Sequence, residues 1–235
     1  MKIWHSILVT LFVFVSAAQA QELVPFENQY SARLYGFTVT ATSRLSLQQN
    51  GIYELVFDVE ALIGRVTETS HVEWSAKDQQ VIPLDYHYKR SGLGKNRDDA
   101  LKIDWLKQSV VYPKDQSSWQ FNATQKIQDN LSYQLQLRQD LINGKKTLVY
   151  PLIDKKAIKD YKFEIVGEEE LETPLGKVKT LKVKRAQTND NRETFAWFAK
   201  DFQYMLVRLQ QEENGSAYTI YISKASINGK AIDHF

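Results

Sequence analysis

The sequence lacks cysteine altogether, and its 235 residues include only ten glycines and five prolines. Without cysteine no disulfide can form, so the fold has to rest on its hydrophobic core. The same absence excludes the lipid anchor of bacterial lipoproteins, which is attached to a cysteine at the cleavage site. A chain of this length can build such a core, because the buried fraction of the surface rises with chain size.

An excess of charge of one sign is also missing. Lysine and arginine number 30 against 28 aspartates and glutamates, which gives a formal net charge of +2. Nucleic-acid-binding proteins usually carry a clustered basic face, so this balance argues against a nucleic-acid partner. It gives no reason to propose attraction to an anionic membrane surface either.

Signatures of nucleophilic catalysis are not found. There is no G-x-S-x-G motif, and Ser91–Gly94 lies in a polar loop without the strand–turn–helix setting that such a nucleophile needs. Lys95 is followed by Asn96, so the phosphate-loop pattern fails. A carboxylate pair for glycoside hydrolysis is assembled in space and stays open. No catalytic residue and no cofactor are therefore predicted.

The one conspicuous apolar run lies at the amino terminus. A charged start is followed by the apolar residues Ile7–Val15 and by the small-x-small sequence Ala18–Ala20. The run is short for a bilayer span, which makes a retained membrane helix the weaker alternative. We predict a secretory signal peptide over residues 1–20, cleaved after Ala20. Since no long linker or repeat interrupts residues 21–235, we predict one soluble periplasmic domain there.

The mature chain alternates between apolar and polar residues as β-strands do. Asn50-Gly51 separates the alternating runs Thr38–Gln48 and Ile52–Leu62, and this pair is typical of a tight hairpin turn. About ten to thirteen strands are expected, mostly antiparallel because the connecting loops are short. Further predicted hairpins join Val66–Trp74 to Val81–Tyr88, Leu101–Trp105 to Val110–Tyr112, and Tyr204–Glu212 to Ala217–Ser223 at Asn214-Gly215.

One segment, QKIQDNLSYQLQLRQDLING at 125–144, departs from this pattern. Its alternation over Leu131–Leu137 fits a strand, but its leucines also fall on one face of a helix. The run is long for a strand, Asp129 is a suitable N-cap, and Asn143-Gly144 is a natural stop. Leucine, glutamine and arginine also favour a helix. We therefore predict an amphipathic helix with a leucine face that includes Leu131, Leu135 and Leu141.

The fold class that follows is mainly β, in a single domain. A large twisted antiparallel sheet is expected to curl into an open or closed barrel, with the helix packed on or in it. A membrane barrel needs an apolar lipid-facing side on every strand. Lys177, Lys179, Lys182 and Lys184 occupy both faces of one predicted strand, so an integral membrane protein is not expected.

The stretch GEEELETPLGKVKTLKVKR, residues 167–185, predicts a hairpin with an acidic and a basic arm. With a four-residue loop, Glu172 faces Lys177 and Glu170 faces Lys179; a three-residue loop with a glycine bulge makes these pairs diagonal. A hard cation needs several converging oxygens in a region of net negative charge. The lysines remove that excess, so the cluster is interpreted as a charge-matched exposed hairpin.

Histidines offer a second candidate for metal binding. The predicted pairing of their strands places Asp85 near His71, with His87 further along the same face and Glu73 beside His71. Two histidines and two carboxylates can bind zinc. The spacings H-x-E and D-x-H are weak signals, and surface or half-buried residues flanked by aromatic side chains explain them better. No metal site is predicted.

Several phrases, in this order, carry a family resemblance: YSARLYGFTVTATSRLSL, IPLDYHYKRSG followed by IDW, QDNLSYQLQLRQDL, YKFEIVGEEELETPLGKVKTLKVKR and WFAKDFQYMLVRLQQEENG. Over residues 30–223 they resemble domain-of-unknown-function family 3108 of exported Gram-negative proteins. The resemblance implies export and a β-rich fold, and it implies no catalytic residues. One departure is Met205–Val207, where a proline is expected before the Val-Arg pair. The expected fold is also similar to the half-barrel carriers of periplasmic lipoproteins, by fold analogy alone.

Aromatic residues complete the prediction of function. In a curled sheet, inward aromatic residues fill the core or line a ligand cavity. The sequence favours non-enzymatic binding or carriage of a hydrophobic or amphipathic component of the cell envelope, such as a lipid. The alternatives are an interaction or assembly factor that contacts an envelope protein through a sheet edge or loop 91–99, and an envelope hydrolase. The predicted ligand contacts are Leu131, Leu135, Leu141, Trp105 and Trp197.

Overall fold

The structure is a computed structural model that describes residues 22–34, 37–61, 64–92, 94–186, 192–213 and 216–235. The predicted signal peptide, the predicted turn at Asn214-Gly215 and Leu93 of the predicted loop lie outside these residues. The elements are β1 (Phe26–Leu34), β2 (Phe37–Leu47), β3 (Tyr53–Ala61), β4 (Gly64–Ser75), β5 (Gln80–Gly92), β6 (Arg97–Asp104), β7 (Ser109–Tyr112), β8 (Ser117–Gln120), α1 (Ser132–Ile142), β9 (Leu148–Asp154), β10 (Ala157–Thr173), β11 (Gly176–Arg185), β12 (Arg192–Ala199), β13 (Met205–Glu213), β14 (Ser216–Ile227) and β15 (Lys230–Ile232).

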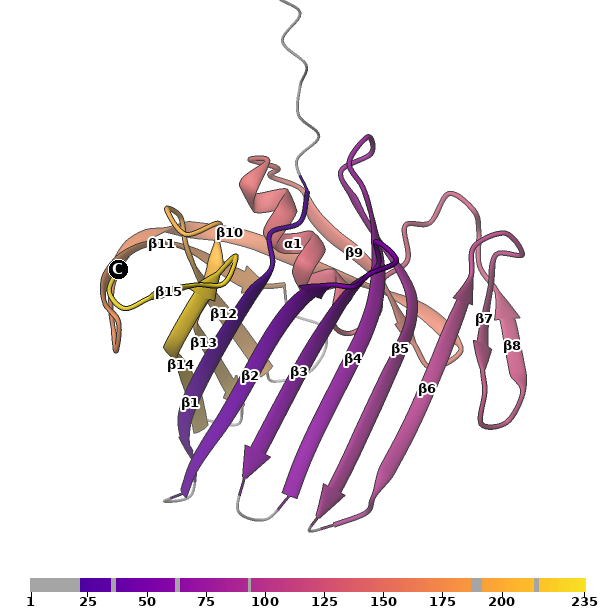
Figure 1. Cartoon of the computed structure of the whole chain (residues 1–235), viewed down its shortest axis with the longest axis horizontal. Coiled ribbons are helices and arrows are strands. Elements are labelled where there is room, and N and C mark those ends of the chain that lie inside the picture. Colours follow the sequence, from indigo (N-terminus) through magenta and orange to yellow (C-terminus); the bar gives the residue numbers. More distant parts are fainter. Residues whose placement is uncertain (1–21, 35–36, 62–63, 93, 187–191, 214–215) are drawn as a thin grey trace, which may run out of the picture.

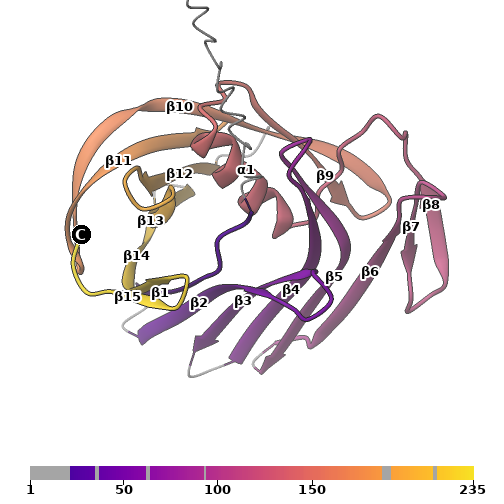
Figure 2. The same ribbon diagram turned by 45° about the horizontal axis from the view of Figure 1, so that its top comes forward.

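The described strands form one antiparallel sheet that curls around the helix (Figures 1 and 2). Its order is β8-β7-β6-β5-β4-β3-β2-β1-β14-β13-β12-β11-β10-β9, with β15 paired to β14. Because no ladder among the described residues joins β8 to β9, the barrel is open, and the predicted fold class is confirmed in its open form. The sheet has fifteen described strands, more than expected, because strands as short as β8 and β15 are too brief to show alternation.

Two of the predicted hairpins show how local residues set the register. In β2–β3, Leu47 pairs with Tyr53 around the Asn50-Gly51 turn, and Gly51 has a φ of 80°. In β10–β11, Thr173 pairs with Gly176, so Glu172 faces Lys177 as the four-residue-loop alternative predicted. The acidic and basic arms are therefore directly opposite each other, and not diagonal.

Helix α1 begins at Ser132 with Leu131 at its N-cap position, so the predicted N-cap, Asp129, lies two residues earlier and reaches the first turn through its side chain. Asp129 Oδ1 accepts hydrogen bonds from the backbone N–H groups of Leu131 and Ser132, both at 2.8 Å, and Ser132 Oγ accepts one from the Asp129 N–H at 2.9 Å. Ser70 on β4 donates to Asp129 Oδ2 at 2.6 Å, which ties the cap to the sheet. Gly144, with a φ of 69°, follows the helix end.

The buried part of α1 extends beyond the predicted leucine face. Gln136, Arg138, Gln139 and Asp140 are buried together with the leucines. The reason is that α1 lies inside the curl and meets the sheet on several sides (Figure 2). Gln136 accepts a hydrogen bond from the Val81 N–H at 2.7 Å and donates to Asp140 at 2.9 Å, so this polar side is anchored on β5.

Three hydrophobic clusters fill the interior. One lies between the start of α1 and the first strands of the sheet, and includes Leu45, Val72 and Ile127. A second lies beneath β12–β14 around Met205. The third packs the end of α1 against β9 and β11, with Leu148 among its members. The clusters surround the space described next without filling all of it.

Candidate functional site

An apolar cavity of about 320 Å³ lies beneath α1, and we call it the inner cavity. Its roof comes from the helix, including Leu131, Leu135 and Leu137. Its walls come from the inner faces of β1–β3 and β10–β14, including Leu209 on β13 and Ile220 on β14, the neighbour of β1 in the sheet. The alternation of side chains along each strand, which places every second residue inward, builds such a wall from many strands.

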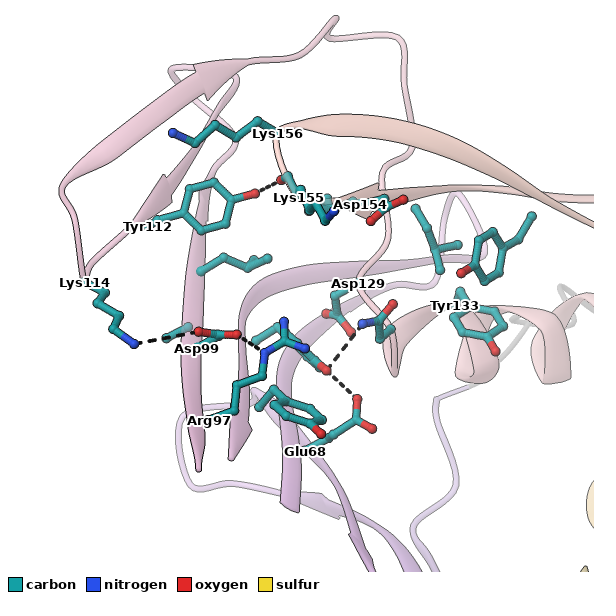
Figure 3. Close-up of a pocket in the computed structure, with 18 of the residues that line it drawn as sticks. Glu68, Arg97, Asp99, Tyr112, Lys114, Asp129, Tyr133, Asp154, Lys155 and Lys156 are labelled. Carbon is teal, nitrogen blue, oxygen red and sulfur yellow. Dashed lines mark hydrogen bonds and ion pairs between the residues drawn. The ribbon is translucent and has the colours of Figure 1, made fainter. Parts of the chain in front are cut away.

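A second cavity of about 950 Å³, the outer cavity, lies where the sheet fails to close (Figure 3). It is bounded by β4–β7, by the segment before α1 and by the β9–β10 turn. Basic and acidic side chains line it in equal number, so its charge is balanced. The basic residues are Arg97, Lys114, Lys155, Lys156 and Arg185, and the acidic residues are Glu68, Asp99, Asp115, Asp129 and Asp154.

Contacts within the outer cavity engage several of these groups. The Tyr86 hydroxyl donates to Glu68, Arg97 pairs with Asp99, and the Tyr112 hydroxyl donates to the Lys155 carbonyl across the open edge (Figure 3). Burial raises the pKa of Glu68, while the Tyr86 hydroxyl opposes that rise. Asp129 also lines this wall, and its carboxylate accepts hydrogen bonds from the backbone N–H groups of Leu131 and Ser132 at the start of the helix. The arrangement is suited to binding polar groups, and it presents no activated nucleophile.

Tyr133 and Arg185 line both cavities and form the boundary between them. The Tyr133 ring lies 5.7 Å from the Tyr161 ring and 6.0 Å from the Phe163 ring, centroid to centroid. The Arg185 guanidinium lies 3.7 Å from the centroid of the Tyr161 ring. Burial raises the pKa of Tyr133 to about 12, so its hydroxyl is neutral at physiological pH. An aromatic ring and a cation thus lie between a mostly apolar space and one lined by many charged side chains.

The inner cavity contains a small buried polar group on a wall that is mostly apolar. Arg138 is 7% exposed, donates from Nε to the Gln203 carbonyl at 2.5 Å, and lies 4.7 Å from the centroid of the Phe26 ring. Burial lowers the pKa of Arg138 to about 10, which leaves it charged at neutral pH. Tyr30 and Asn28 line the same cavity, and Asn28 donates to the Tyr30 hydroxyl at 3.5 Å.

The five predicted ligand contacts are divided between this site and the packed core. Leu131 and Leu135 line the inner cavity. Leu141 packs in the third cluster, Trp105 donates to the Pro83 carbonyl at 2.7 Å, and Trp197 donates to Glu169; these three line neither cavity.

Sequence reasoning did not single out Tyr133, Arg138 or Arg185. A signal was present for Arg138, because an arginine next to two leucine-face positions of a mostly buried helix is unusual. Arginine also favours helices, which accounts for its presence in the predicted helix without a binding role. Nothing local distinguished Arg185 from its basic neighbours on the same strand.

The predicted histidine neighbourhood is present in the sheet. Asp85 pairs with His71 across β4–β5, and their side chains meet at 2.8 Å from Nδ1 to Oδ1. Partial burial works against the charged ring, but Asp85 and Glu54 raise the pKa of His71 above its ordinary value. His87 instead contacts Asp98 at 2.6 Å. Among the described residues, no three His, Asp or Glu side chains are grouped so that they could hold a metal ion.

Comparison with known proteins gives a family and a fold. The family described as "Protein of unknown function (DUF3108)" matches residues 29–223. No curated protein matches the chain. A solved β-barrel-like protein of the domain of unknown function DUF1849 from Brucella abortus is similar in fold, with a TM-score of 0.57 and 10% sequence identity over 89% of this chain and 100% of that one. In the described part of the chain, no helix is long and apolar enough to cross a membrane.

Proposed function

Because this chain belongs to the DUF3108 family of proteins of unknown function, its function has to be inferred from its own site, and we propose that it binds and carries an amphipathic ligand. One observation carries the proposal: an apolar cavity under α1 adjoins a polar cavity through Tyr133 and Arg185. Ligand pockets are mostly apolar, with a small number of placed polar groups, and the inner cavity has that composition.

The two cavities have different roles in this proposal. The inner cavity, at about 320 Å³, is near the lower end of the range for ligand pockets, roughly 300–1,000 Å³. It suits one apolar chain, covered by Leu131 and Leu135. The outer cavity supplies a polar access route at the open edge of the sheet. No catalytic residue is needed, and Leu141, Trp105 and Trp197 support the fold around the site.

We further infer that the ligand belongs to the cell envelope and is met in the periplasm. This rests on the signal peptide predicted over residues 1–20 and on the single domain predicted over residues 21–235. The test is amino-terminal sequencing of the protein from a periplasmic extract. A chain beginning at Gln21 supports export, and an intact Met1 contradicts it.

Binding is tested by filling the inner cavity. Leu209 lines this cavity and is half-buried, so Leu209→Trp places an indole where the ligand chain would lie. Leu106, 97% exposed in the β6–β7 turn, gives the matched control Leu106→Trp. Native mass spectrometry of freshly purified protein is expected to show a co-purified amphiphile in the wild type and in Leu106→Trp, and none in Leu209→Trp. A wild-type protein that is empty in repeated preparations would contradict the proposal.

A further inference from the structure

Arg138 is a buried cation inside a cavity whose wall is otherwise mostly apolar. Its side chain projects from α1 into the curl, where Phe26 and Tyr30 of β1 are its neighbours. The backbone carbonyl of Gln203 accepts one hydrogen bond, from Nε, and the remaining guanidinium N–H groups have no hydrogen-bond acceptor among the described residues. Burying a charge is costly unless it is paired and hydrogen-bonded, so this position needs an explanation.

The described residues offer Arg138 no anionic partner. No acidic side chain forms an ion pair with it in the described part of the chain, and the Tyr30 hydroxyl is the ionisable group whose charge would act on its pKa. Burial raises the pKa of Tyr30 to about 12, so that hydroxyl does not supply a negative charge. The two residues therefore face the cavity as a cation and a neutral hydroxyl.

Asn28 is a second, independent sign of an incomplete polar group. It is 2% exposed, lines the same cavity, and its Oδ1 has no hydrogen-bond donor among the described residues. Buried polar side chains nearly always have partners, and those that do not call for an explanation at each site. Arg138, Tyr30 and Asn28 thus form a polar group that is built into the wall, in which Arg138 is bonded to one backbone carbonyl and the Asn28 oxygen has no donor among the described residues.

We propose that Arg138 anchors the acidic head group of the ligand, a carboxylate or phosphate carried on one apolar chain. The inference rests on the proposed function and names the class of its ligand. The guanidinium fork matches the geometry of both acids and can bind them with two parallel hydrogen bonds. Tyr30 and Asn28 add neutral hydrogen-bonding groups, and the walls around Phe57, Leu209 and Ile220 take the chain.

Arg185 is a second cation that an acidic ligand would meet as it moves from the outer cavity to the inner one. It lines both cavities, and among the described residues it has no carboxylate partner; its described contact is the face of Tyr161. A cation between the two cavities favours an anionic ligand over a neutral one of the same chain length. The reason is that the cation stabilises the head group as the ligand leaves the outer cavity. The ligand then passes from one arginine to the other.

The test compares three single-chain amphiphiles by isothermal titration calorimetry on the purified protein after removal of bound lipid. Hexadecanoate and hexadecyl phosphate carry an acid, and hexadecanol has the same chain without charge. We expect the wild type to bind at least one acid about tenfold more tightly than hexadecanol, or more, because hydrogen bonds to charged groups are the strong ones. The tighter of the two acids identifies the head group.

Substitutions then assign this preference to one residue. Arg138→Met, similar in length and uncharged, is expected to lower the affinity for the acid to that for hexadecanol and to leave hexadecanol unchanged. Arg138→Lys should keep part of the preference. The matched control is Arg90→Met, at an exposed position on β5 outside both cavities, and it should behave as the wild type does.

The outcomes separate this inference from the proposed function. If the wild type binds hexadecanol as tightly as both acids, the anchor is wrong and chain binding stands. If none of the three amphiphiles binds, the proposed function itself fails. Should Arg138→Met not fold, ¹³C NMR of carboxyl-labelled hexadecanoate bound to the wild type decides the matter. A carboxyl pKa depressed below that of the free acid supports the anchor, and an unshifted one overturns it.

Discussion

Single polar residues in the interior differ in how well the protein satisfies them. Asp129 accepts hydrogen bonds from two backbone N–H groups and from the Ser70 hydroxyl, so its burial is explained by the helix that it caps. Arg138 has one carbonyl and an aromatic face, and Asn28 has an oxygen without a donor among the described residues. Since unpaired buried groups cost free energy, we assign Asp129 to the fold and Arg138 to the ligand.

Asp129 predicts a pH dependence of stability. Burial raises its pKa to about 6 from an ordinary value of 3.8, although its hydrogen bonds work in the other direction. The folded chain therefore keeps this proton to a higher pH than the unfolded chain does. The stabilisation is fully present below about pH 4 and is lost as the pH rises through 6, by about 3 kcal/mol in all.

The change Asp129→Asn isolates that contribution. The amide keeps an oxygen acceptor for the Leu131 and Ser132 N–H groups but does not titrate. Urea denaturation of both proteins from pH 4 to pH 7 is expected to show the variant gaining stability relative to the wild type as the pH rises. Parallel curves for the two proteins over this range would show that the buried carboxyl does not titrate there.

If Arg138 serves the ligand, its removal should lower affinity for the acid without lowering the stability of the ligand-free protein. In the absence of ligand, Arg138→Met removes an unpaired buried charge, so the free energy of unfolding should stay the same or rise by about 1–2 kcal/mol. A residue kept for the fold would show the opposite sign, because its contacts with Phe26 and Gln203 would be lost. Equilibrium urea denaturation of ligand-free protein measures this. A loss of stability in Arg138→Met would assign the arginine to the fold.

At the scale of elements, the β10–β11 hairpin is more than an exposed charge pair. Lys177 lies 3.3 Å from Glu172 and 3.9 Å from Glu170, and such exposed pairs contribute little to stability. The tip of the hairpin, however, contacts the carboxyl-terminal residues. The Phe235 N–H donates to the Leu175 carbonyl at 2.8 Å, and the Phe235 ring lies 4.8 Å from the Phe202 ring. The turn therefore has a packing role that its charges do not show.

Gly176 is the position at which this role can be measured. Its φ is +104°, and an added Cβ would meet the imidazole of His234. Gly176→Ala should lower the free energy of unfolding by about 1 kcal/mol or more, because a residue with a Cβ is strained at this φ. The double variant Gly176→Ala/His234→Ala separates the two causes. Equal losses in both backgrounds are expected, since His234 is exposed and can turn away; full recovery in the double variant would mean that the clash dominates.

The elements that could be predicted from the sequence are those that depend on nearby residues. Asn50-Gly51 fixed one hairpin, and Asp129 with Gly144 marked the ends of the helix. The site depends on residues far apart in the chain: Ser223 donates to the Gln29 carbonyl across a separation of 194 positions, and Arg138 meets Gln203. No periodicity reports such pairings. For the same reason Trp197, which alternates inward as expected, ended in a packed cluster and not in a cavity.

At the scale of the whole molecule, the open barrel offers the proposed ligand both a space and an access route. The pairing of β1 with β14 joins the two ends of the described chain into one wall, and the missing ladder between β8 and β9 leaves the outer cavity beside α1. The helix is held on β5 through Gln136 and is capped against β4 through Asp129. With the helix fixed over an unfilled curl, the proposed ligand would complete the interior from the open side.

A ligand that completes the interior should stabilise the entire fold. At a free hexadecanoate concentration one hundred times its Kd, the free energy of unfolding is expected to rise by about 2.7 kcal/mol, because the ligand binds the folded state alone. Leu106→Trp should show the same rise, and Leu209→Trp should show none. Thermal or urea denaturation with and without ligand measures the effect.

Hydrogen exchange locates the same stabilisation in the sheet. Strands on both sides of the inner cavity, β1–β3 and β10–β14, should become protected together on addition of hexadecanoate, because one chain contacts both walls. Protection confined to β5–β7 would place the ligand in the outer cavity, where it meets balanced charge and no apolar roof. In that case the inner cavity would have no part in binding, and Arg138 would have to be explained by the fold.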